Sequence, residues 1–252
     1  MEQDLPDPGL LDLLNTWLRL RTEAIANTLG LYGTHQEQLL MSYDLTFSGH
    51  QHAPNRASGE PYLLHPFRQL VRMALRILKF GVTDPYFIKL LLCVILLHDT
   101  VEDALKGKTT PFVAYSKICT LLDELTAYSV LSLTKKKSEP GGAESREEFL
   151  ERVLRNDQWV VLVAKPEDMI DNLSTLQALP LDKQPGKIRE ALTYGPRMKE
   201  RAERFIVMAG KGGNLSDWEG WLQVVADQHA ELEALALKEK RRVALTGYRF
   251  NF

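Results

Sequence analysis

The chain has 252 residues, enough for one sizeable domain or two small ones. Lysine and arginine (31) nearly balance aspartate and glutamate (33), and the net charge of −2 gives no sign of a nucleic-acid or anionic-membrane partner. The apolar run 88–97 is too short to cross a bilayer, and the acidic start MEQDLPDPG lacks a hydrophobic signal region. We therefore expect a cytoplasmic protein whose two cysteines are reduced.

The first part of the chain combines helical stretches with one polar segment. Residues 8–31 carry apolar side chains at helical spacing after Asp7, so we expect a helix that packs on the main domain. Residues 45–61 are polar and contain glycine and proline, which predicts a loop long enough to carry function. Residues 66–80 form an amphipathic helix ending at Gly81, and its arginine stripe is most simply a solvent-exposed face. The stripe consists of Arg68, Arg72 and Arg76.

The stretch 85–103 is the centre of the predicted fold. Its apolar run begins after Asp84, a good helix N-cap, and ends in the polar hexapeptide HDTVED, residues 98–103. A soluble protein buries such a run, so we expect a core helix whose end carries one imidazole and three carboxylates. So many ionisable groups beside a core are costly unless they bind something, and a metal ion is the simplest candidate.

The chain returns to helical periodicity after this stretch. Residues 111–133 carry apolar side chains at helical spacing. The basic, glycine-containing segment 134–143 is a linker that we expect to be mobile. Ser145 and Glu148 have the spacing of a capping box, which predicts that a helix begins there.

Three further helices complete the chain. Residues 159–179 begin apolar and then carry acidic side chains, and residues 187–209 are helical with an expected break at the glycine-proline pair 195–196. A second capping box, Ser216 with Glu219, starts the C-terminal helix. No convincing alternating strand occurs, so the sequence predicts an all-α fold.

Three of these helices carry groups that could converge on one metal ion. The candidate ligands are His65, His98, Asp99 and Asp168. Two imidazoles and two carboxylates suit manganese, iron or magnesium better than a structural zinc site, and they leave about two octahedral positions for water and a substrate oxygen. Glu102 and Asp103 are close enough in sequence to orient that water or take its proton. Singly, each ligand has a plainer explanation, such as a hydrogen-bonded helix end or a solvated helix face.

Four sequence elements occur in a recognisable order. They are NRASGEPYLLHP (55–66), LLHDTVED (96–103), LTK (133–135) and DMIDNLSTL (168–176). In this order they resemble the HD-type hydrolase domain of the RelA/SpoT alarmone family, and KIREALTYGP (187–196) resembles the helix that follows in that family. The resemblance implies an HD-domain helical bundle at residues 46–200, with extra helices in 1–45 and 201–252. The last segment is too short for the family's synthetase domain.

The resemblance also implies an activity and its residues. Such a domain holds one manganese ion, or another divalent metal, and removes the 3′-pyrophosphate from ppGpp or pppGpp, giving GDP or GTP plus pyrophosphate. The resemblance makes the metal ligands His65, His98, Asp99 and Asp168. It assigns the handling of the attacking water to a catalytic pair, Glu102 and Asp103. The implied nucleoside contacts are Arg56, Ser58, Asn172 and Thr175.

The third motif departs from the family pattern. Met169, Asp171 and Ser174 stand where the family usually has Arg, His and Arg, and Ala57 replaces a loop lysine. These changes remove cations and add an anion near a polyanionic substrate. They give weight to the adenosine analogue of ppGpp, or to a nucleotide such as NADPH with a 2′- or 3′-phosphate. A third interpretation is a neutralising partner of a cognate alarmone-synthetase toxin. The sequence indicates no oligomeric state.

Overall fold

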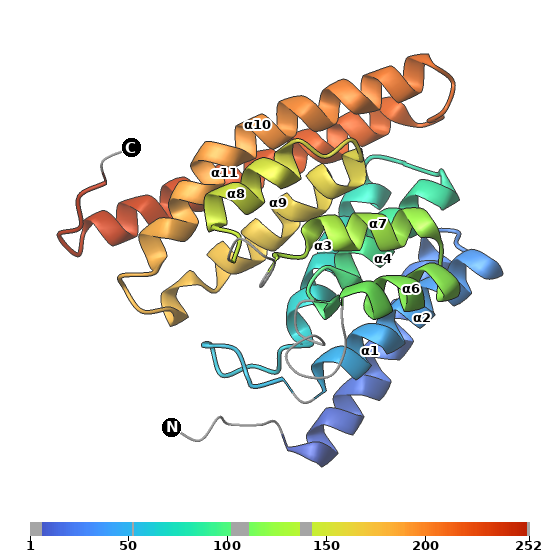
Figure 1. Ribbon diagram of the computed structural model, residues 1–252, viewed down its shortest axis with the longest axis horizontal. Coiled ribbons are helices and arrows are strands. Elements are labelled where there is room, and N and C mark those ends of the chain that lie inside the picture. Colours follow the sequence, from blue (N-terminus) through green and yellow to red (C-terminus); the bar gives the residue numbers. More distant parts are fainter. Residues whose placement is uncertain (1–6, 52, 102–110, 137–142, 251–252) are drawn as a thin grey trace.

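The computed structural model describes residues 7–51, 53–101, 111–136 and 143–250, and these residues form a helical bundle without a strand. The all-α prediction is therefore confirmed for the part of the chain that the structure describes (Figure 1). The α-helices are α1 (Pro8–Thr28), α2 (Thr34–His50), α3 (Leu64–Lys79), α4 (Pro85–Leu97), α6 (Pro111–Leu121), α7 (Glu124–Leu133), α8 (Arg146–Leu154), α9 (Trp159–Ser174), α10 (Gln184–Lys211) and α11 (Trp218–Ala244). A short 3-10 helix, η1 (Leu176–Ala178), follows α9.

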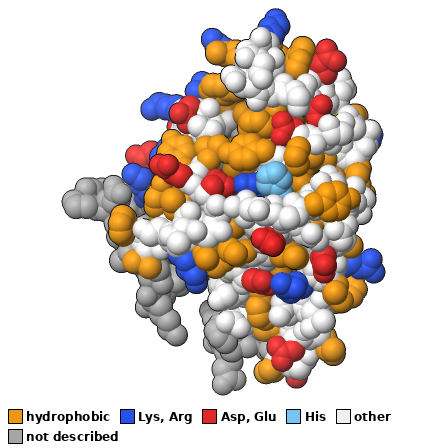
Figure 2. Space-filling model, turned by 90° about the vertical axis from the view of Figure 1, so that its right-hand side faces the viewer, with side chains coloured by type: hydrophobic (Ala, Val, Ile, Leu, Met, Phe, Trp, Pro, Cys, Tyr) orange, Lys and Arg blue, Asp and Glu red, His pale blue; other side chains and the backbone are white. Residues whose placement is uncertain are grey.

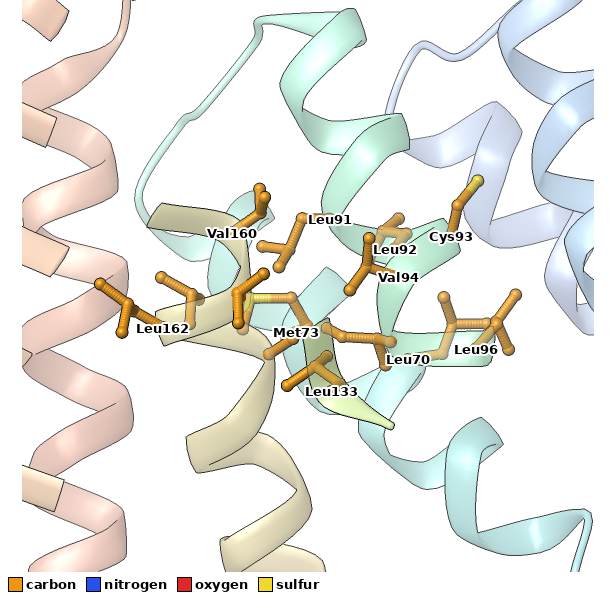
Figure 3. Packing of buried hydrophobic residues seen from close by; sticks show 14 of the residues in the cluster. Leu70, Met73, Leu91, Leu92, Cys93, Val94, Leu96, Leu133, Val160 and Leu162 are labelled. Carbon is orange, nitrogen blue, oxygen red and sulfur yellow. The ribbon is translucent and has the colours of Figure 1, made fainter. Parts of the chain in front are cut away.

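Helix α4 forms the core of the bundle. Asp84 caps it by accepting hydrogen bonds from the backbone N–H groups of Tyr86 and Phe87, and Pro85 occupies its first turn, as predicted. Residues 88–97 are all buried, with α2, α3, α7 and α9 packed around them. Figure 3 shows side chains of α3, α7 and α9 meeting those of α4. Because each fully buried Leu or Ile contributes about 1.5–3 kcal/mol, α4 holds its neighbours together.

Helix α4 ends earlier than the sequence pattern suggested. Its last residue is Leu97, and residues 98–99 form a turn before helical backbone resumes. The turn consists of His98 and Asp99, the first two residues of the polar hexapeptide. Glu102 and Asp103 lie outside the described residues.

Helix α2 packs on α4 and replaces part of the predicted loop. The loop prediction for 45–61 is wrong for residues 45–50, which belong to α2. The buried face of α2 is partly polar: the hydroxyl of Thr46 lies 2.8 Å from the carbonyl oxygen of Ser42 and 2.9 Å from that of Leu96. Because helix carbonyls satisfy such hydroxyls, this face can be buried without a continuous apolar stripe.

Helices α10 and α11 lie side by side along one edge of the bundle (Figure 1). The predicted break in α10 is wrong, since the helix continues through Pro196. A proline inside a helix costs about 3 kcal/mol, and the packing of α10 against both α9 and α11 offsets this. Gly195 permits the close approach, because a Cβ there would lie 3.0 Å from Cδ2 of Leu232.

The two predicted capping boxes have different outcomes. The box at Ser145 is confirmed: its hydroxyl accepts from the backbone of Glu148, whose carboxylate accepts from the backbone of Ser145. The box at Ser216 is wrong, because its hydroxyl lies 3.4 Å from Oδ2 of Asp84 instead. The neighbouring Asp217 accepts hydrogen bonds from the same loop before α4. These contacts tie the start of α11 to that loop.

The helical stretch expected at 111–133 is divided into α6 and α7. The chain turns at Asp123, whose carboxylate caps α7 by accepting a hydrogen bond from the backbone of Thr126. Asp123 also pairs with the buried Lys89 of α4 at 2.7 Å. The cap therefore fixes the turn against the core.

The surface carries charges of both signs. On the face shown in Figure 2, acidic and basic side chains are scattered among apolar ones. On this face neither sign of charge forms an extended area. Within the described ranges, no helix has the length and apolar character needed to span a membrane.

Candidate metal centre

The four predicted ligands meet near the end of α4. They are His65 at the start of α3, His98 and Asp99 after α4, and Asp168 on α9. Nε2 of His65 lies 3.4 Å from Oδ2 of Asp99 and 3.3 Å from Oδ1 of Asp168. Nε2 of His98 lies 3.2 Å and 3.8 Å from the same two oxygens. Ligand atoms of His65, His98 and Asp99 all lie within 4.8 Å of one another, and Oδ1 of Asp168 lies beside both imidazoles, so this spacing suits a shared cation.

The centre is buried. His65, His98 and Asp168 are at most 5% exposed, and only the Asp99 side chain, at 20%, reaches solvent appreciably. Nε2 of His98 is buried and has no hydrogen-bond partner among the described residues. A buried polar atom without a partner is costly. A cation between the imidazoles and the carboxylates would satisfy it, so the donor set fits a divalent metal ion.

The charges of the centre favour a positive group at its middle. Burial alone would lower the pKa of His65, but hydrogen bonds to Asp168, Asp171 and Asp99 raise it to about 8. Burial likewise opposes charge on His98, yet Asp99 and Asp168 raise its pKa to about 10. The carboxylates therefore favour protons on these rings, and a metal ion could take the place of those protons.

Neighbouring side chains orient the two carboxylates. Lys165, one turn earlier on α9, donates to Oδ2 of Asp168, and Nδ2 of Asn172 donates to Oδ1 at 2.6 Å. The hydroxyl of Tyr62 donates to Oδ2 of Asp99 at 2.8 Å. Outer hydrogen bonds of this kind hold ligating groups in position. Tyr62 and Lys165 are site residues that the sequence analysis missed.

Arg56 reaches the centre from the loop before α3. Its guanidinium donates to Oδ2 of Asp171 and to Oδ1 of Asn172, at 2.9 Å each. Its central carbon lies 5.9 Å from the centroid of the Tyr62 ring. Of the expected nucleoside contacts, Asn172 therefore contacts the candidate ligand Asp168, and Arg56 contacts Asn172.

The other two expected nucleoside contacts lie farther out. Ser58 is exposed in a turn closed by the backbone hydrogen bond from Arg56 to Glu60, with Gly59 at φ +82°. Thr175 follows α9, and its hydroxyl lies 3.2 Å from the carbonyl oxygen of Asp171. No hydrogen bond joins Ser58 or Thr175 to the four ligands within the described part of the chain. The catalytic pair expected at 102–103 lies outside that part.

Asp171 is not the unfavourable anion that its sequence context suggested. It is fully buried on α9, and its carboxylate accepts hydrogen bonds from Arg56, Arg68 and Arg72 at 2.8–3.1 Å. Oδ2 of Asp171 also lies 2.6 Å from Nδ1 of His65. Three guanidinium groups compensate its charge, so a nearby phosphate does not meet an exposed carboxylate.

The arginine stripe of α3 faces other helices, and its assignment to solvent is wrong. Arg76 is only 4% exposed and contacts Glu167 of α9 together with Asp227 and Glu231 of α11. Glu167 and Asp171 lie four residues apart, as the arginines do. Matching spacing of opposite charges on two helices was the signal that could have revealed this pairing.

Comparisons with known proteins agree with the motifs. A protein of Aquifex aeolicus named guanosine-3′,5′-bis(diphosphate) 3′-pyrophosphohydrolase is 29% identical over 200 residues, which are 78% of this chain and 25% of that protein. A Mycoplasma genitalium protein named probable guanosine-3′,5′-bis(diphosphate) 3′-pyrophosphohydrolase is 29% identical over 158 residues, 60% of this chain and 20% of its own length. A Streptomyces coelicolor protein named GTP pyrophosphokinase is 31% identical over 161 residues, 63% of this chain and 17% of that protein.

The matched region is a small part of each relative. The chain spans a quarter or less of the length of these three proteins. No protein-family model matches the chain. The similarity to proteins named as pyrophosphohydrolases nevertheless confirms the resemblance of this chain to the RelA/SpoT-type alarmone hydrolases.

Proposed function

We propose that this chain is a metal-dependent hydrolase of the 3′-pyrophosphate of ppGpp or pppGpp, or of the adenosine analogue ppApp. The observation that supports this most is the convergence of two imidazoles and two carboxylates at one buried point. The similarity to proteins named as pyrophosphohydrolases supports the choice of substrate. Manganese is the ion that we propose, and other divalent ions suit the same donors.

The chain's own residues would divide the work in the following way. His65, His98, Asp99 and Asp168 would hold the ion, while Lys165, Asn172 and Tyr62 keep the carboxylates oriented. When bound, the ion supplies Lewis acidity, which polarises phosphoryl oxygens and makes water a better nucleophile at neutral pH.

Hydrolysis breaks the bond between phosphorus and the 3′ oxygen. The water oxygen joins the phosphorus, and one water proton ends on the released 3′ hydroxyl. We assign the handling of that proton to Glu102 and Asp103, which follow the ligand pair 98–99 in the chain.

Arg56 is the proposed contact to the nucleobase. A planar guanidinium stacks well on a planar ring, and stacking costs less when the guanidinium is already fixed. Arg56 is fixed in this way by Asp171 and Asn172. Ser58 and Thr175 are proposed as neighbouring contacts at the edge of the same pocket.

A second substrate class deserves the same test. Met169 is buried, and the hydroxyl of Ser174 lies 2.7 Å from the carbonyl oxygen of Asp171. Both side chains are uncharged, so neither position supplies a cation to a phosphate group. A nucleotide with a single 2′- or 3′-phosphate, such as NADPH, carries less charge near these positions than ppGpp does. The loss of cations favours this alternative.

A substrate panel tests the proposal. The purified chain is incubated with manganese and ppGpp, pppGpp, ppApp or NADPH, and the products are separated by chromatography. Release of pyrophosphate from ppGpp and pppGpp is the expected result. Release from ppApp alone would assign a different base pocket, and release of phosphate from NADPH would establish the second substrate class. Absence of any turnover by manganese-loaded protein would contradict the hydrolase and favour a neutralising partner.

Three variants locate the activity. Asp99→Ala should lose both manganese binding and turnover, whereas Glu102→Ala should bind manganese and lose turnover. The exposed Asp182 serves as the control, and Asp182→Ala should retain both properties. Turnover in both site variants would contradict the proposed centre.

A further inference from the structure

Asp171 is a buried carboxylate with an unusual set of partners. It lies on α9, three residues after Asp168 and on the side facing α3. Burying a carboxylate is costly unless it is paired and hydrogen-bonded. Its partners include His65, which is one of the four convergent ligands. The contact therefore concerns the metal centre as well as the stability of the fold.

The contact between Asp171 and His65 selects one tautomer of the imidazole. Nδ1 of His65 lies 2.6 Å from Oδ2 of Asp171, while Nε2 faces Asp99 and Asp168. A carboxylate at Nδ1 holds the proton there, which leaves the lone pair of Nε2 available to a metal. In this structure the amide nitrogen of Gln69 lies 2.9 Å from Nε2 and donates to the lone pair that a metal ion would take in its place.

The second imidazole is arranged in the same way. Nδ1 of His98 lies 2.8 Å from the carbonyl oxygen of Ile95, and its Nε2 faces the same two carboxylates as that of His65. An outer partner on one ring nitrogen is the usual arrangement for a histidine that binds metal through the other. Both rings therefore present Nε2 to one point.

Three arginines hold Asp171 in place. Arg68 contacts both carboxylate oxygens, at 2.9 and 2.8 Å, and Arg72 and Arg56 contact one oxygen each. A bidentate guanidinium fixes the plane of a carboxylate as well as its position. Asp171 is therefore a fixed acceptor for His65.

We propose that Asp171 is a positioning residue of the metal centre, which fixes the tautomer and orientation of His65 and links them to Arg56. Oδ2 of Asp171 contacts both Nδ1 of His65 and the guanidinium of Arg56. One oxygen atom thus aligns a metal ligand and a substrate contact. This inference rests on the proposed function in two respects, since it takes His65 to be a metal ligand and Arg56 to be a substrate contact.

The test measures manganese binding without nucleotide. Asp171→Asn keeps the size of the side chain and removes its charge, and titration calorimetry with manganese alone should show an affinity about 10–100-fold weaker than that of the unaltered protein. Glu60→Gln is the matched control. It removes another carboxylate bound to Arg68, and Glu60 has no hydrogen bond to His65 in the described residues. Its manganese affinity should stay within about twofold of the unaltered value.

A second measurement needs no variant. Nitrogen-15 spectra of the unaltered protein with zinc, a diamagnetic substitute, should show His65 protonated at Nδ1 and bound to metal through Nε2. The opposite tautomer would overturn the inference. So would an Asp171→Asn variant that is folded by circular dichroism and binds manganese as tightly as Glu60→Gln does.

These outcomes separate the inference from the proposed function. Protein that binds manganese through Asp171-oriented His65 and hydrolyses no nucleotide would leave this inference standing and contradict the hydrolase. If the unaltered protein hydrolyses ppGpp and Asp171→Asn binds manganese normally, the hydrolase stands and this inference is contradicted.

Discussion

The hydroxyl of Tyr62 donates a 2.8 Å hydrogen bond to Oδ2 of Asp99, and the ring of Tyr62 stacks on that of His50 with centroids 4.8 Å apart. The hydrogen bond joins the loop before α3 to a carboxylate that follows α4. Asp99 has the largest exposure to solvent of the four convergent ligands. Because solvent reaches Asp99, packing alone does not fix its side chain, and its orientation depends on the hydrogen bond from Tyr62.

Tyr62→Phe should weaken manganese binding by about tenfold, because Asp99 loses the hydrogen bond that orients it. The ring remains, so its stacking on His50 is preserved. Titration calorimetry with manganese measures the effect. Tyr128→Phe, on the partly exposed face of α7, is the control and should bind as the unaltered protein does. Equal affinities for the two variants would show that Tyr62 does not orient Asp99.

Arg76 connects three helices through buried charges. It contacts Glu167 of α9 and Asp227 and Glu231 of α11 from its place on α3. Arg76→Met would leave Glu167 buried with fewer cations, and removing one partner of a buried ion pair costs about 3–5 kcal/mol. Urea unfolding of Arg76→Met should show a free energy of unfolding lower by this amount than that of the unaltered protein.

The control for Arg76 is an exposed pair of the same kind. Arg197 of α10 binds Glu151 of α8 at 2.6 Å, but the arginine side chain is 47% exposed. Arg197→Met should lose less than about 1 kcal/mol, because solvent screens such pairs. Similar losses for Arg197→Met and Arg76→Met would mean that burial does not strengthen the Arg76 network.

The sequence predicted those features that depend on neighbouring residues. The core helix α4 followed from an apolar run with a cap at Asp84 and a proline at Pro85, which are local signals. The convergence of His65 and Asp168 was a hypothesis from ligand-type residues on separate helices, which the resemblance supported, since no spacing along one helix could have brought them together. The structure places their side chains 3.3 Å apart.

The sequence did not reveal features that depend on pairing between helices. The buried face of α2 includes Thr46, whose hydroxyl is satisfied by carbonyl oxygens, so apolar periodicity underestimates that helix. Most partners of Arg76 and Asp171 are separated from them by about 100 residues or more along the chain. Tertiary packing decides whether such a charge is solvated or buried. The charge pattern of one helix carries no information about which helices pack against it.

His229 should make the protein less stable in mild acid. It is buried between α10 and α11, and burial, together with the charges of Lys199 and Arg76, lowers its pKa to about 4. An unfolded histidine has a pKa of about 6.5, so the unfolded chain binds the proton more tightly. The contribution of neutral His229 is therefore complete above pH 6.5 and is lost as the pH falls toward 4.

The expected loss is about 2 kcal/mol between pH 7 and pH 5. Urea unfolding at the two values measures it for the unaltered protein and for His229→Leu, which has no group to titrate there. The decrease should be smaller by about that amount in His229→Leu. Parallel decreases in the two proteins would show that other groups cause the acid sensitivity.

Gly210 is required where α10 meets the start of α11. A Cβ at this position would lie 2.1 Å from Cγ of Trp218, a distance that no packing tolerates without movement of the two helices. Gly213 follows at φ +74°, and the backbone N–H of Asn214 bonds to the carbonyl oxygen of Ala209, so the turn after α10 leaves the chain little freedom to shift.

Gly210→Ala should destabilise the protein by about 1–3 kcal/mol, because overpacking outweighs the better helix propensity of alanine. Gly186, in the first turn of the same helix, is the control, since a Cβ there would meet nothing within 4 Å. Gly186→Ala should stabilise by about 0.4–1 kcal/mol through the lower entropy of the unfolded chain. Thermal and urea unfolding of the two variants should therefore shift in opposite directions, and a stabilising Gly210→Ala would contradict the close approach of α10 and Trp218.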